Sequence, residues 1–484
     1  MRFVDNFLNG ITMYRMVLYG LTALTFLAIL FGFLGVLPYA GYWLFASAAI
    51  LLASCYISNY IFAKIFSVPV NVESSFITAL ILFLIMTPPS VISDLKILAL
   101  TGIIAMASKY LIAPLRRHIF NPAAFSAAAI FLLGLGGAAW WVETPVMFPA
   151  ILIVGFLIVK KIRRFDLFLP FLVAGLTSII YFGIINGLDP ITLLRLTLLS
   201  GPIFFFGTIM LAEPITTPPT RRLRIIYAVI IGVFYSFLAP EFILLVGNIF
   251  SYFAGFNRKL ILTLKEKRPI ANDIYEFIFS PDRPVAFTPG QYLEYTLPHQ
   301  KSDSRGNRRY FTIAASPTEG SINIGAKFNN PPSSFKRALA GMRLGEKISA
   351  GQLAGDFVLP RDKNLKIVFI TGGIGVTPYR SMIKYLVDSG ERRDIILLYA
   401  AKLEGEIAYR YLLNEAGAKI GLRTEYIISK LIDAALVRNK VPDWRERIFY
   451  ISGPEAMVSA FKKMLRRMGV ARRKIVTDYF PGFA

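Results

Sequence analysis

The pattern of apolar and polar positions divides the chain into two halves. Up to about residue 256 the sequence is a series of long apolar runs, rich in Leu, Ile, Phe, Ala and Gly, that are separated by short polar turns. From residue 257 onward charges recur every few residues, and Gly and Pro interrupt shorter apolar segments. This change predicts a polytopic α-helical membrane domain over residues 1–256, followed by a soluble half.

Ten apolar segments in the first half are candidate membrane spans. A bilayer core requires about 20 apolar residues per straight helix, and fewer where helices are broken or buried among neighbours. The ten segments cover approximately 12–36, 41–63, 74–89, 95–114, 121–137, 146–160, 166–186, 191–212, 224–238 and 241–256. Residues 1–10 lack a long charged region and a small-residue cleavage site, so we expect a retained first span rather than a removable signal peptide.

The loops between these segments predict one orientation. Basic residues gather in alternate loops and at the C-terminal exit, at Lys64, Arg116, Arg117, Lys160, Lys161, Arg163, Arg164, Arg221, Arg222, Arg224, Arg258, Lys259, Lys265 and Lys267. The opposite loops carry Asp94, Glu143, Asp189 and Glu241. Because basic loops stay in the cytoplasm, the pattern predicts a multi-pass protein of the cell (inner) membrane with both termini cytoplasmic.

The soluble half shows two successive rhythms. From Leu260 short alternating strands with frequent turn signals predict an antiparallel β-barrel over residues 257–360. After about Asn364 strands alternate with helices, which predicts a nucleotide-binding α/β domain over residues 361–484.

Composition excludes several classes of function. The formal charge of +23 lies in membrane loops and is scattered through the soluble half, so we expect no nucleic-acid partner. Cys55 is the single cysteine, which excludes a four-thiolate iron–sulfur cluster. His118 and His299 are the two histidines, too few for a transmembrane pair of haems that each need two ligands. We expect no metal site.

Two segments of the predicted barrel suit a flavin dinucleotide. Residues 309–317 read RYFTIAASP, where Arg309 can pair with pyrophosphate, Phe311 can lie against an isoalloxazine and Thr312 can bond its N5 edge. Tyr292, in a neighbouring strand, is a further candidate contact. Ser333 and Ser334 open a helix whose free amides can bind phosphate, although serines there also serve as ordinary caps. Taken alone, the RYFTIAASP sequence fits any strand of a barrel.

The α/β domain contains a glycine-rich turn between a strand and a helix. Residues 370–378 read ITGGIGVTP and supply Gly372, Gly373, Gly375, Thr377 and Pro378 as candidate contacts of a nicotinamide dinucleotide. Ser452, Gly453 and Pro454 end the last clear strand, where ligands bind in such sheets.

Together these strings resemble the ferredoxin–NADP reductase superfamily over about residues 258–484. The resemblance implies a FAD-binding barrel, an NAD(P)-binding domain, and a C-terminal Asp478-Tyr479-Phe480 near the flavin. Many relatives have Cys where this chain has Ser452, so the resemblance implies slower or differently tuned hydride transfer rather than its loss.

The membrane half has a repeated pattern. Residues 77–90 (ITALILFLIMTPPS) and 207–220 (GTIMLAEPITTPPT) are apolar segments that end in Pro-rich chain at corresponding places in the two groups of five spans. Such interruptions point to a site near the membrane midplane, but Thr-Pro-Pro is also an ordinary helix end. Asn121-Pro122, Glu213-Pro214 and Thr216 are the candidate site residues, with a solvated loop carboxylate as the alternative for Glu213.

A second resemblance covers about residues 70–256 and is to a membrane family. It rests on FNPAAF, the upstream Lys109-Tyr110, MLAEPITTPPT with the following residues 221–227, and Asn248. This family comprises the D-type membrane subunit of Rnf electron-transport complexes and the B-type membrane subunit of the sodium-pumping NADH:quinone reductase. It implies ten spans in two inverted halves and a bound FMN or riboflavin. The Ser-Gly-Ala-Thr motif that carries covalent FMN is absent, and Thr144 is its nearest relic. We therefore expect a non-covalent flavin, FMN or riboflavin, or a quinone pocket.

The combined pattern predicts a membrane-bound oxidoreductase that passes electrons from NAD(P)H through FAD to a flavin or quinone in the membrane domain. Ion translocation coupled to this flow and a separate redox partner protein stay open, as does an alternative, an ion transporter or channel with a regulatory flavin module. Lys402 and Arg410 can meet a 2′-phosphate or serve as surface charges, so the sequence leaves NADH and NADPH undecided.

Overall fold

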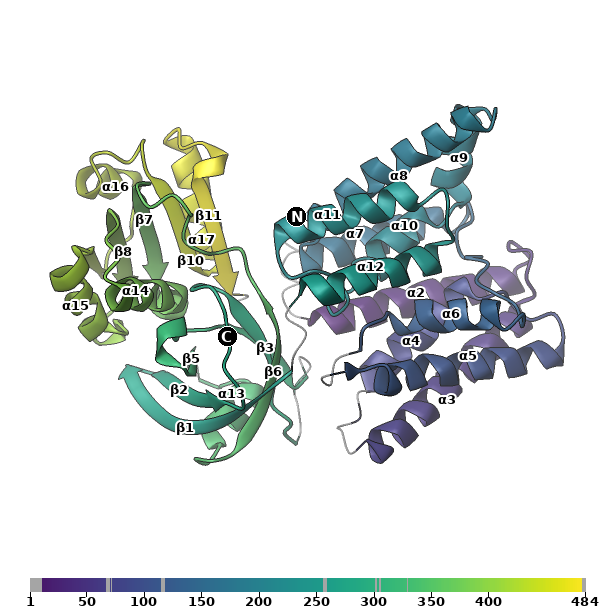
Figure 1. The fold of residues 1–484 in the computed structure, drawn as a ribbon, viewed down its shortest axis with the longest axis horizontal. Helices are drawn as coiled ribbons and strands as arrows, with labels where there is room; N and C mark the ends of the chain where they lie inside the picture. Colours follow the sequence, from purple (N-terminus) through teal and green to yellow (C-terminus); the bar gives the residue numbers. More distant parts are fainter. Residues whose placement is uncertain are drawn as a thin grey trace. The chain divides into compact units, whose positions relative to one another are not determined.

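The computed structural model describes residues 11–66, 70, 72–114, 118–255, 259–300, 303, 306–328 and 330–480, without the side chains of Tyr479 and Phe480. The chain forms two compact units, Met1–Arg258 and Lys259–Ala484. Figure 1 colours the first from purple to teal and the second from green to yellow. The expectations for residues 1–10 and for Arg116, Arg117 and Arg258 fall outside the described residues.

The first unit is helical (Figure 1), and each of the ten predicted segments contains a helix. The helices are α2 (Met13–Phe33), α3 (Gly41–Ile65), α4 (Val72–Ile85), α5 (Ile92–Leu111), α6 (Pro122–Leu132), α7 (Phe148–Ile162), α8 (Phe165–Ile185), α9 (Pro190–Ser200), α10 (Ile203–Phe205) with the π-helix η2 (Phe206–Met210), α11 (Arg221–Phe234) and α12 (Pro240–Ala254).

Fewer helices than expected are long enough to cross a membrane. By length and composition three of the described helices qualify, namely α2, α3 and α8, and a fourth span results if α9 and residues 203–210, bent by 61°, count as one. Helices α4, α6 and α12 are apolar but shorter. Proline and glycine explain part of the difference: α6 starts at Pro122 and ends before Gly134, which has a φ of +69°.

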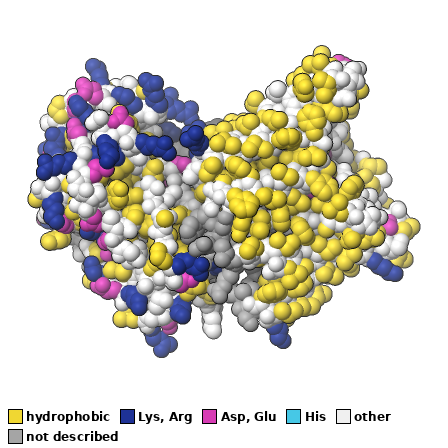
Figure 2. Space-filling view, in the orientation of Figure 1, with side chains coloured by type: hydrophobic (Ala, Val, Ile, Leu, Met, Phe, Trp, Pro, Cys, Tyr) yellow, Lys and Arg dark blue, Asp and Glu magenta, His cyan; other side chains and the backbone are white. Residues whose placement is uncertain are grey.

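Close helix packing in this unit depends on small residues. A Cβ on Gly232 of α11 would lie 2.6 Å from the Cβ of Ala174 in α8. Large apolar side chains instead face outward; Phe26, Phe45 and Val173 are each more than 60% exposed. Figure 2 shows hydrophobic side chains over most of the visible face of this unit. Small residues between helices and apolar side chains outside are the arrangement expected in lipid.

The second unit begins with a half-barrel of six antiparallel strands in the order β4-β3-β6-β1-β2-β5. These strands are β1 (Leu260–Ala271), β2 (Ile274–Pro281), β3 (Tyr292–Thr296), β4 (Arg308–Thr312), β5 (Ile322–Lys327) and β6 (Lys347–Ala354), with α13 (Ser334–Gly341) between β5 and β6. The antiparallel strands confirm the sequence prediction for this region.

A five-stranded parallel sheet follows, in the order β11-β10-β7-β8-β9. Its strands are β7 (Ile367–Gly372), β8 (Ile395–Ala401), β9 (Arg423–Ile428), β10 (Ile448–Pro454) and β11 (Ile475–Phe480). Two separate apolar cores contain residues of α14 (Thr377–Ser389) and α15 (Arg410–Ile420), and of α16 (Ala434–Lys440) and α17 (Glu455–Arg467). The sheet is thus doubly wound, and its strand order reverses between β7 and β10, where ligands bind in such folds.

Candidate functional site

The glycine-rich turn follows β7 directly. Residues Gly373–Val376 form a single 3-10 turn, η4, and α14 starts at Thr377 with Pro378 in its first turn. Gly373 has a φ of +54°, which favours glycine. A Cβ on Gly375 would lie 2.5 Å from the carbonyl oxygen of Ser452, so the turn and the end of β10 touch backbone to backbone. The structure therefore brings together two candidate segments that lie about 80 residues apart in the sequence.

The end of β10 carries buried polar groups. Ser452 pairs with Thr371 of β7 across the parallel ladder, and both side chains are fully buried. Their hydroxyls have no hydrogen-bond partner in the described part of the chain. An unsatisfied buried hydroxyl costs about 1–3 kcal/mol, so two at neighbouring positions are an unusual feature of this end of the sheet.

Gly453 and Pro454 complete this edge of the sheet. Gly453 has a φ of +154°, and its Cβ would lie 2.3 Å from the Met457 methyl carbon. Gly372 is close to the same methionine, since its Cβ would lie 2.8 Å from the Met457 sulfur. The backbone of β11 pairs Tyr479 with Gly453 and Phe480 with Pro454, while both aromatic side chains lie outside the described residues.

On the half-barrel, Arg309 and the first residue of α13 both donate hydrogen bonds to the carboxylate of Asp303. The Arg309 Nη2 donates to Asp303 Oδ1 at 3.1 Å, and the backbone N–H of Ser334 donates to Asp303 Oδ2 at 3.1 Å. Ser333 caps the helix, because its hydroxyl accepts a bond from the backbone N–H of Lys336 at 3.3 Å. The carboxylate of Asp303 thus occupies a position suited to a phosphate group, and the donor set fits a dinucleotide diphosphate.

The aromatic candidates lie on two faces of the half-barrel. Phe335, beside Ser334, packs 5.8 Å from the ring of Phe311 and 5.3 Å from the guanidinium of Arg309. Thr312 pairs with Tyr292 across the β3–β4 ladder, and successive side chains of a strand point to opposite faces. The strand period therefore places Thr312 and Tyr292 on the other side of the sheet from Phe311.

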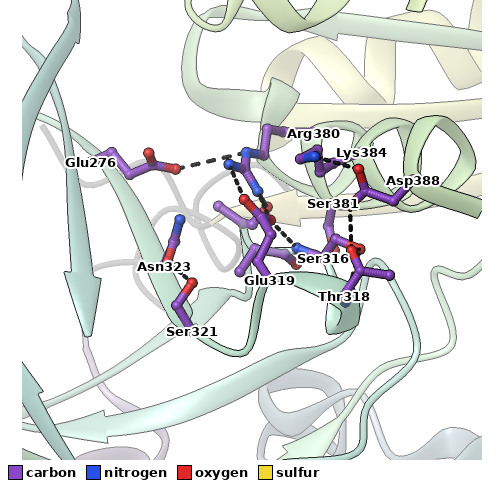
Figure 3. Close-up of polar contacts among 12 residues, drawn as sticks. Glu276, Ser316, Thr318, Glu319, Ser321, Asn323, Arg380, Ser381, Lys384 and Asp388 are labelled. Atoms are coloured by element: carbon purple, nitrogen blue, oxygen red, sulfur yellow. Dashed lines mark hydrogen bonds and ion pairs between the residues drawn. The ribbon is translucent and has the colours of Figure 1, made fainter. Parts of the chain in front are cut away.

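A buried arginine, which the sequence analysis missed, joins the half-barrel to the parallel-sheet part (Figure 3). Arg380 of α14 is 8% exposed and donates to the carbonyl of Ala314 at 3.0 Å and to Glu319 Oε1 at 2.8 Å. Its Nε lies 3.8 Å from Glu276 Oε1, which also accepts a bond from the Tyr409 hydroxyl at 3.1 Å. Burial raises the pKa of Tyr409, so the phenol stays a donor. No local signal singles out Arg380 in the sequence, because Ser381, Lys384 and Asp388 make the same part of α14 polar.

Lys402 and Arg410 follow β8, as expected from the sequence. Arg410 forms an ion pair with Glu404 at 2.8 Å, and its guanidinium lies 5.1 Å from the ring centre of Tyr426. The backbone N–H of Lys402 donates to Glu406 Oε2 at 3.1 Å. One glutamate therefore pairs with the side chain of Arg410, and another contacts the backbone of Lys402.

The membrane-site candidates also come together. Glu213 Oε2 accepts bonds from Asn121 Nδ2 at 2.8 Å and from the Thr216 hydroxyl at 3.2 Å. The backbone N–H of Asn121, just before Pro122, donates to Asn248 Oδ1 at 2.7 Å. Asn121, Thr216 and Asn248 are each at most 3% exposed. This polar cluster, which we call the Glu213 cluster, lies inside an otherwise apolar helical unit.

Other candidates have plain structural roles. The Thr144 hydroxyl accepts a bond from the backbone N–H of Met147 at 3.3 Å, at the entry to α7. Pro214 offers its carbonyl to the Thr217 hydroxyl at 3.3 Å. Cys55 is buried, with its sulfur 3.7 Å from the carbonyl of Gly102. Among the described residues no group of three or more His, Cys, Asp or Glu is arranged to hold a metal ion.

Several known proteins are similar to the second unit of the chain. Residues 369–463 match the oxidoreductase NAD-binding domain. The chain is 26% identical over 242 residues to the flavohemoprotein of Oceanobacillus iheyensis, covering 46% of this chain and 58% of that protein. It is 28% identical over 196 residues to the NADPH oxidoreductase of Mycobacterium tuberculosis, covering 39% of this chain and 50% of that protein.

Two further similarities involve an electron-transfer component and a solved structure. The xylene/toluene monooxygenase electron transfer component of Pseudomonas putida is 28% identical over 235 residues, which cover 45% of this chain and 64% of that protein. The FAD/NAD-binding domain of Vibrio cholerae nitric oxide dioxygenase is 19% identical, with 46% of this chain and 98% of that chain covered and a TM-score of 0.41. The chain spans less than two thirds of the length of the curated relatives named here.

The C-terminal unit is therefore a ferredoxin–NADP reductase-like module of the NAD(P)H-dependent oxidoreductase type, as its motifs predict. The resemblance of the first half to the membrane subunits of Rnf complexes and of the sodium-pumping reductase stays a prediction.

Proposed function

We propose that the protein is a membrane-bound flavin oxidoreductase that passes electrons from NAD(P)H through FAD to a flavin or quinone in its membrane domain. The observation that carries the proposal is the closeness of Gly375 to Ser452, which joins the glycine-rich turn to the end of β10 beside two buried hydroxyls that lack a described partner. In this proposal the domains are residues 1–256 in the membrane, 257–360 for FAD and 361–484 for NAD(P).

The residues have distinct roles in this proposal. FAD would supply the redox chemistry, because it takes two electrons as hydride and can release them singly. Gly373 lets the backbone approach the nicotinamide dinucleotide, since a Cβ there would meet no atom within 4 Å. Gly375 lets the same turn pack against the end of β10, beside the buried hydroxyls of Thr371 and Ser452. The remaining proposed nucleotide contacts are Gly372, Thr377, Pro378, Gly453 and Pro454, with Tyr479 and Phe480 near the flavin.

The flavin half depends on the Arg309 side of the half-barrel. Arg309 and the N–H groups at Ser333 and Ser334 would hold the diphosphate, and Phe311 would pack against the flavin from the same face. Thr312 and Tyr292 lie on the other side of the sheet and would contact the flavin at the end of β4, which is Thr312. Arg380 would keep the two parts of the module in fixed relation, because it belongs to α14 and contacts Ala314 and Glu276 of the half-barrel.

The Arg309 assignment is tested by flavin content. In purified full-length protein, Arg309→Leu removes a charge-assisted donor worth about 1.5–3 kcal/mol, which predicts FAD affinity about 10- to 150-fold weaker. Arg343→Leu is the matched control, since Arg343 is 89% exposed and lies on a turn of the same half-barrel. Flavin is released by denaturation and quantified by fluorescence. Full FAD content in the Arg309 variant would contradict the assignment.

For the membrane half we propose that the ten helical segments lie in the cell membrane with both termini in the cytoplasm. The three long apolar helices and the outward apolar side chains support this proposal. The acceptor, a non-covalent FMN, riboflavin or a quinone, would bind at the Glu213 cluster, because polar groups buried in a lipid-facing unit are costly unless they serve a ligand or a pathway.

Glu213→Gln tests the acceptor site. The variant keeps the shape of the side chain but removes the charge that strengthens the bonds from Asn121 and Thr216. We expect quinone reduction to fall about tenfold or more, while reduction of a soluble dye by NADH or NADPH stays unchanged. Asp94→Asn is the control, because Asp94 lies in the same unit outside the Glu213 cluster. Equal loss of both activities would contradict a separate membrane site.

Coupling of electron flow to ion translocation extends the proposal. Its support is a pair of further buried carboxylates: Glu143 accepts from the backbone N–H of Phe205 at 2.7 Å, and Glu241 from Trp140 Nε1 at 3.2 Å. Sodium dependence of turnover in proteoliposomes distinguishes a coupled pump from a simple dehydrogenase, which turns over equally in potassium.

A further inference from the structure

Positive charge is concentrated at one end of the soluble unit. Residues 455–474 contain seven Lys or Arg and one acidic residue, and form α17 and the short turn η6 (Arg472–Lys474). The exposed cations among them, which we call the basic face, are Lys463, Arg466, Arg467, Arg472 and Arg473. None of the five forms an ion pair with another described residue. Figure 2 shows Lys and Arg side chains along the upper edge of this unit, where Figure 1 draws α16 and yellow C-terminal segments.

A surface hollow of about 420 Å³ adjoins the basic face; it is lined by Arg438, Pro442, Asp443, Trp444, Arg445, Glu446 and Met468. Met468 directly follows α17, and Lys474 of η6 donates to the carbonyl of Arg445 at 2.8 Å. The hollow and the basic face are therefore continuous. Trp444 and Met468 are at most 9% exposed and give the hollow an apolar floor.

The charges around the hollow favour an anion. Its two carboxylates are already neutralised: Asp443 pairs with Arg447 at 2.7 Å, and Glu446 pairs with Lys366 at 2.7 Å. Arg438 and Arg445 have no carboxylate partner among the described residues. The guanidinium of Arg445 lies 5.1 Å from the ring centre of Trp444, which holds it at the rim.

The basic face lies away from the cofactor edge of the sheet. Arg445 and η6 precede the first residues of β10 and β11, whereas the candidate nucleotide contacts lie at the ends of these strands. Seven residues of strand at about 3.3 Å each separate the two edges by roughly 20 Å. The basic face is therefore separate from the candidate nucleotide contacts, and a surface bound to it leaves the cofactor edge uncovered.

We propose that the basic face and the adjoining hollow bind anionic phospholipid of the membrane that holds the helical unit, with a headgroup phosphate between Arg438 and Arg445. This inference rests on the membrane location proposed above. The soluble unit is tethered to that membrane by a short connection, because β1 starts at Leu260, six residues after α12 ends at Ala254. Each basic residue near an anionic leaflet strengthens association about fivefold, an effect confined to roughly 8 Å at physiological salt. The five cations of the basic face therefore suffice to hold a tethered module against the lipid.

Hydrogen–deuterium exchange of the full-length protein tests this proposal. One sample is in nanodiscs of phosphatidylcholine, the other in nanodiscs of equal parts phosphatidylcholine and phosphatidylglycerol. We expect slower exchange over residues 434–474 in the anionic nanodiscs only, and loss of this protection at high salt. Equal exchange in the two lipids would overturn the proposal. The same protection from inorganic phosphate added to neutral nanodiscs would also overturn it, because the ligand would then be the free ion.

Two charge-reversal variants sharpen the test. Arg472→Glu with Arg473→Glu should weaken docking at least about 25-fold, from fivefold per cation, and so abolish the protection. Lys265→Glu with Lys347→Glu changes the same charge at exposed positions of β1 and β6 and should leave it intact. Unchanged FAD content and NADH-dependent bleaching in both variants verify the fold. Protection lost equally in both would mean that net charge, not this face, is responsible.

Discussion

Gly375→Ala should weaken the binding of NADH and NADPH. Its Cβ would lie 2.5 Å from the carbonyl oxygen of Ser452 and 2.8 Å from the Cα of Gly453. Both are backbone atoms, so no flexible side chain can move aside, and the turn must shift away from β10. Overpacking of this kind costs about 1–3 kcal/mol, which corresponds to about 5- to 150-fold in an equilibrium constant.

Stopped-flow bleaching of the flavin at several NADH or NADPH concentrations gives the apparent Kd, and thermal denaturation shows how much of the strain appears as lost stability. Gly341→Ala is the matched control, since a Cβ there meets no atom within 4 Å. The control should behave as the wild type. A Gly375→Ala variant with wild-type Kd and melting temperature would refute the close contact from which the nucleotide site is built.

Three further predictions concern the same unit. Arg380→Met leaves the buried Glu276 and the partly buried Glu319 without their cation, which should cost about 3–5 kcal/mol and lower the melting temperature clearly. The hydrogen bond from Arg447 lowers the pKa of Asp443 to about 2. This pair therefore stabilises the fold above about pH 4, and its contribution is lost as the pH falls towards 2. The Asp443→Asn variant should have a lower melting temperature than the wild type at pH 7 and nearly the same melting temperature near pH 2. Asp303→Ala removes the carboxylate that engages the proposed diphosphate donors, so titration of flavin-free protein should show tighter FAD binding, and weaker binding would contradict that site.

Local signals made the nucleotide turn predictable from the sequence. Gly373 and Gly375 lie between a strand and a helix, and the chemistry of such a turn depends on adjacent residues. The sheet could likewise be predicted, because strand–helix alternation is visible over short windows. The placement of Phe311 and Thr312 on opposite faces of the sheet could also be predicted, because successive side chains of a strand alternate between the two faces.

Contacts between distant segments could not be predicted in the same way. Arg380 meets Glu276, which lies more than 100 residues earlier, and no local pattern pairs them. Asn121 and Glu213 were identified as separate candidates, whereas the hydrogen bond that joins them depends on the packing of the helices. The number of spans was uncertain for another reason: an apolar run gives the extent of hydrophobic chain, but proline and glycine decide how much of it is straight helix.

The central claim is that electrons from reduced nicotinamide enter a FAD and continue into the membrane unit. Anaerobic titration of detergent-purified full-length protein with NADH and NADPH, followed by absorbance and by identification of the extracted flavins, tests it most directly. The account predicts FAD together with a second flavin of the FMN or riboflavin type, or FAD with added quinone as oxidant, and bleaching by at least one reduced nicotinamide. Protein without FAD, protein with a haem Soret band, or a flavin that neither nicotinamide bleaches would contradict the account.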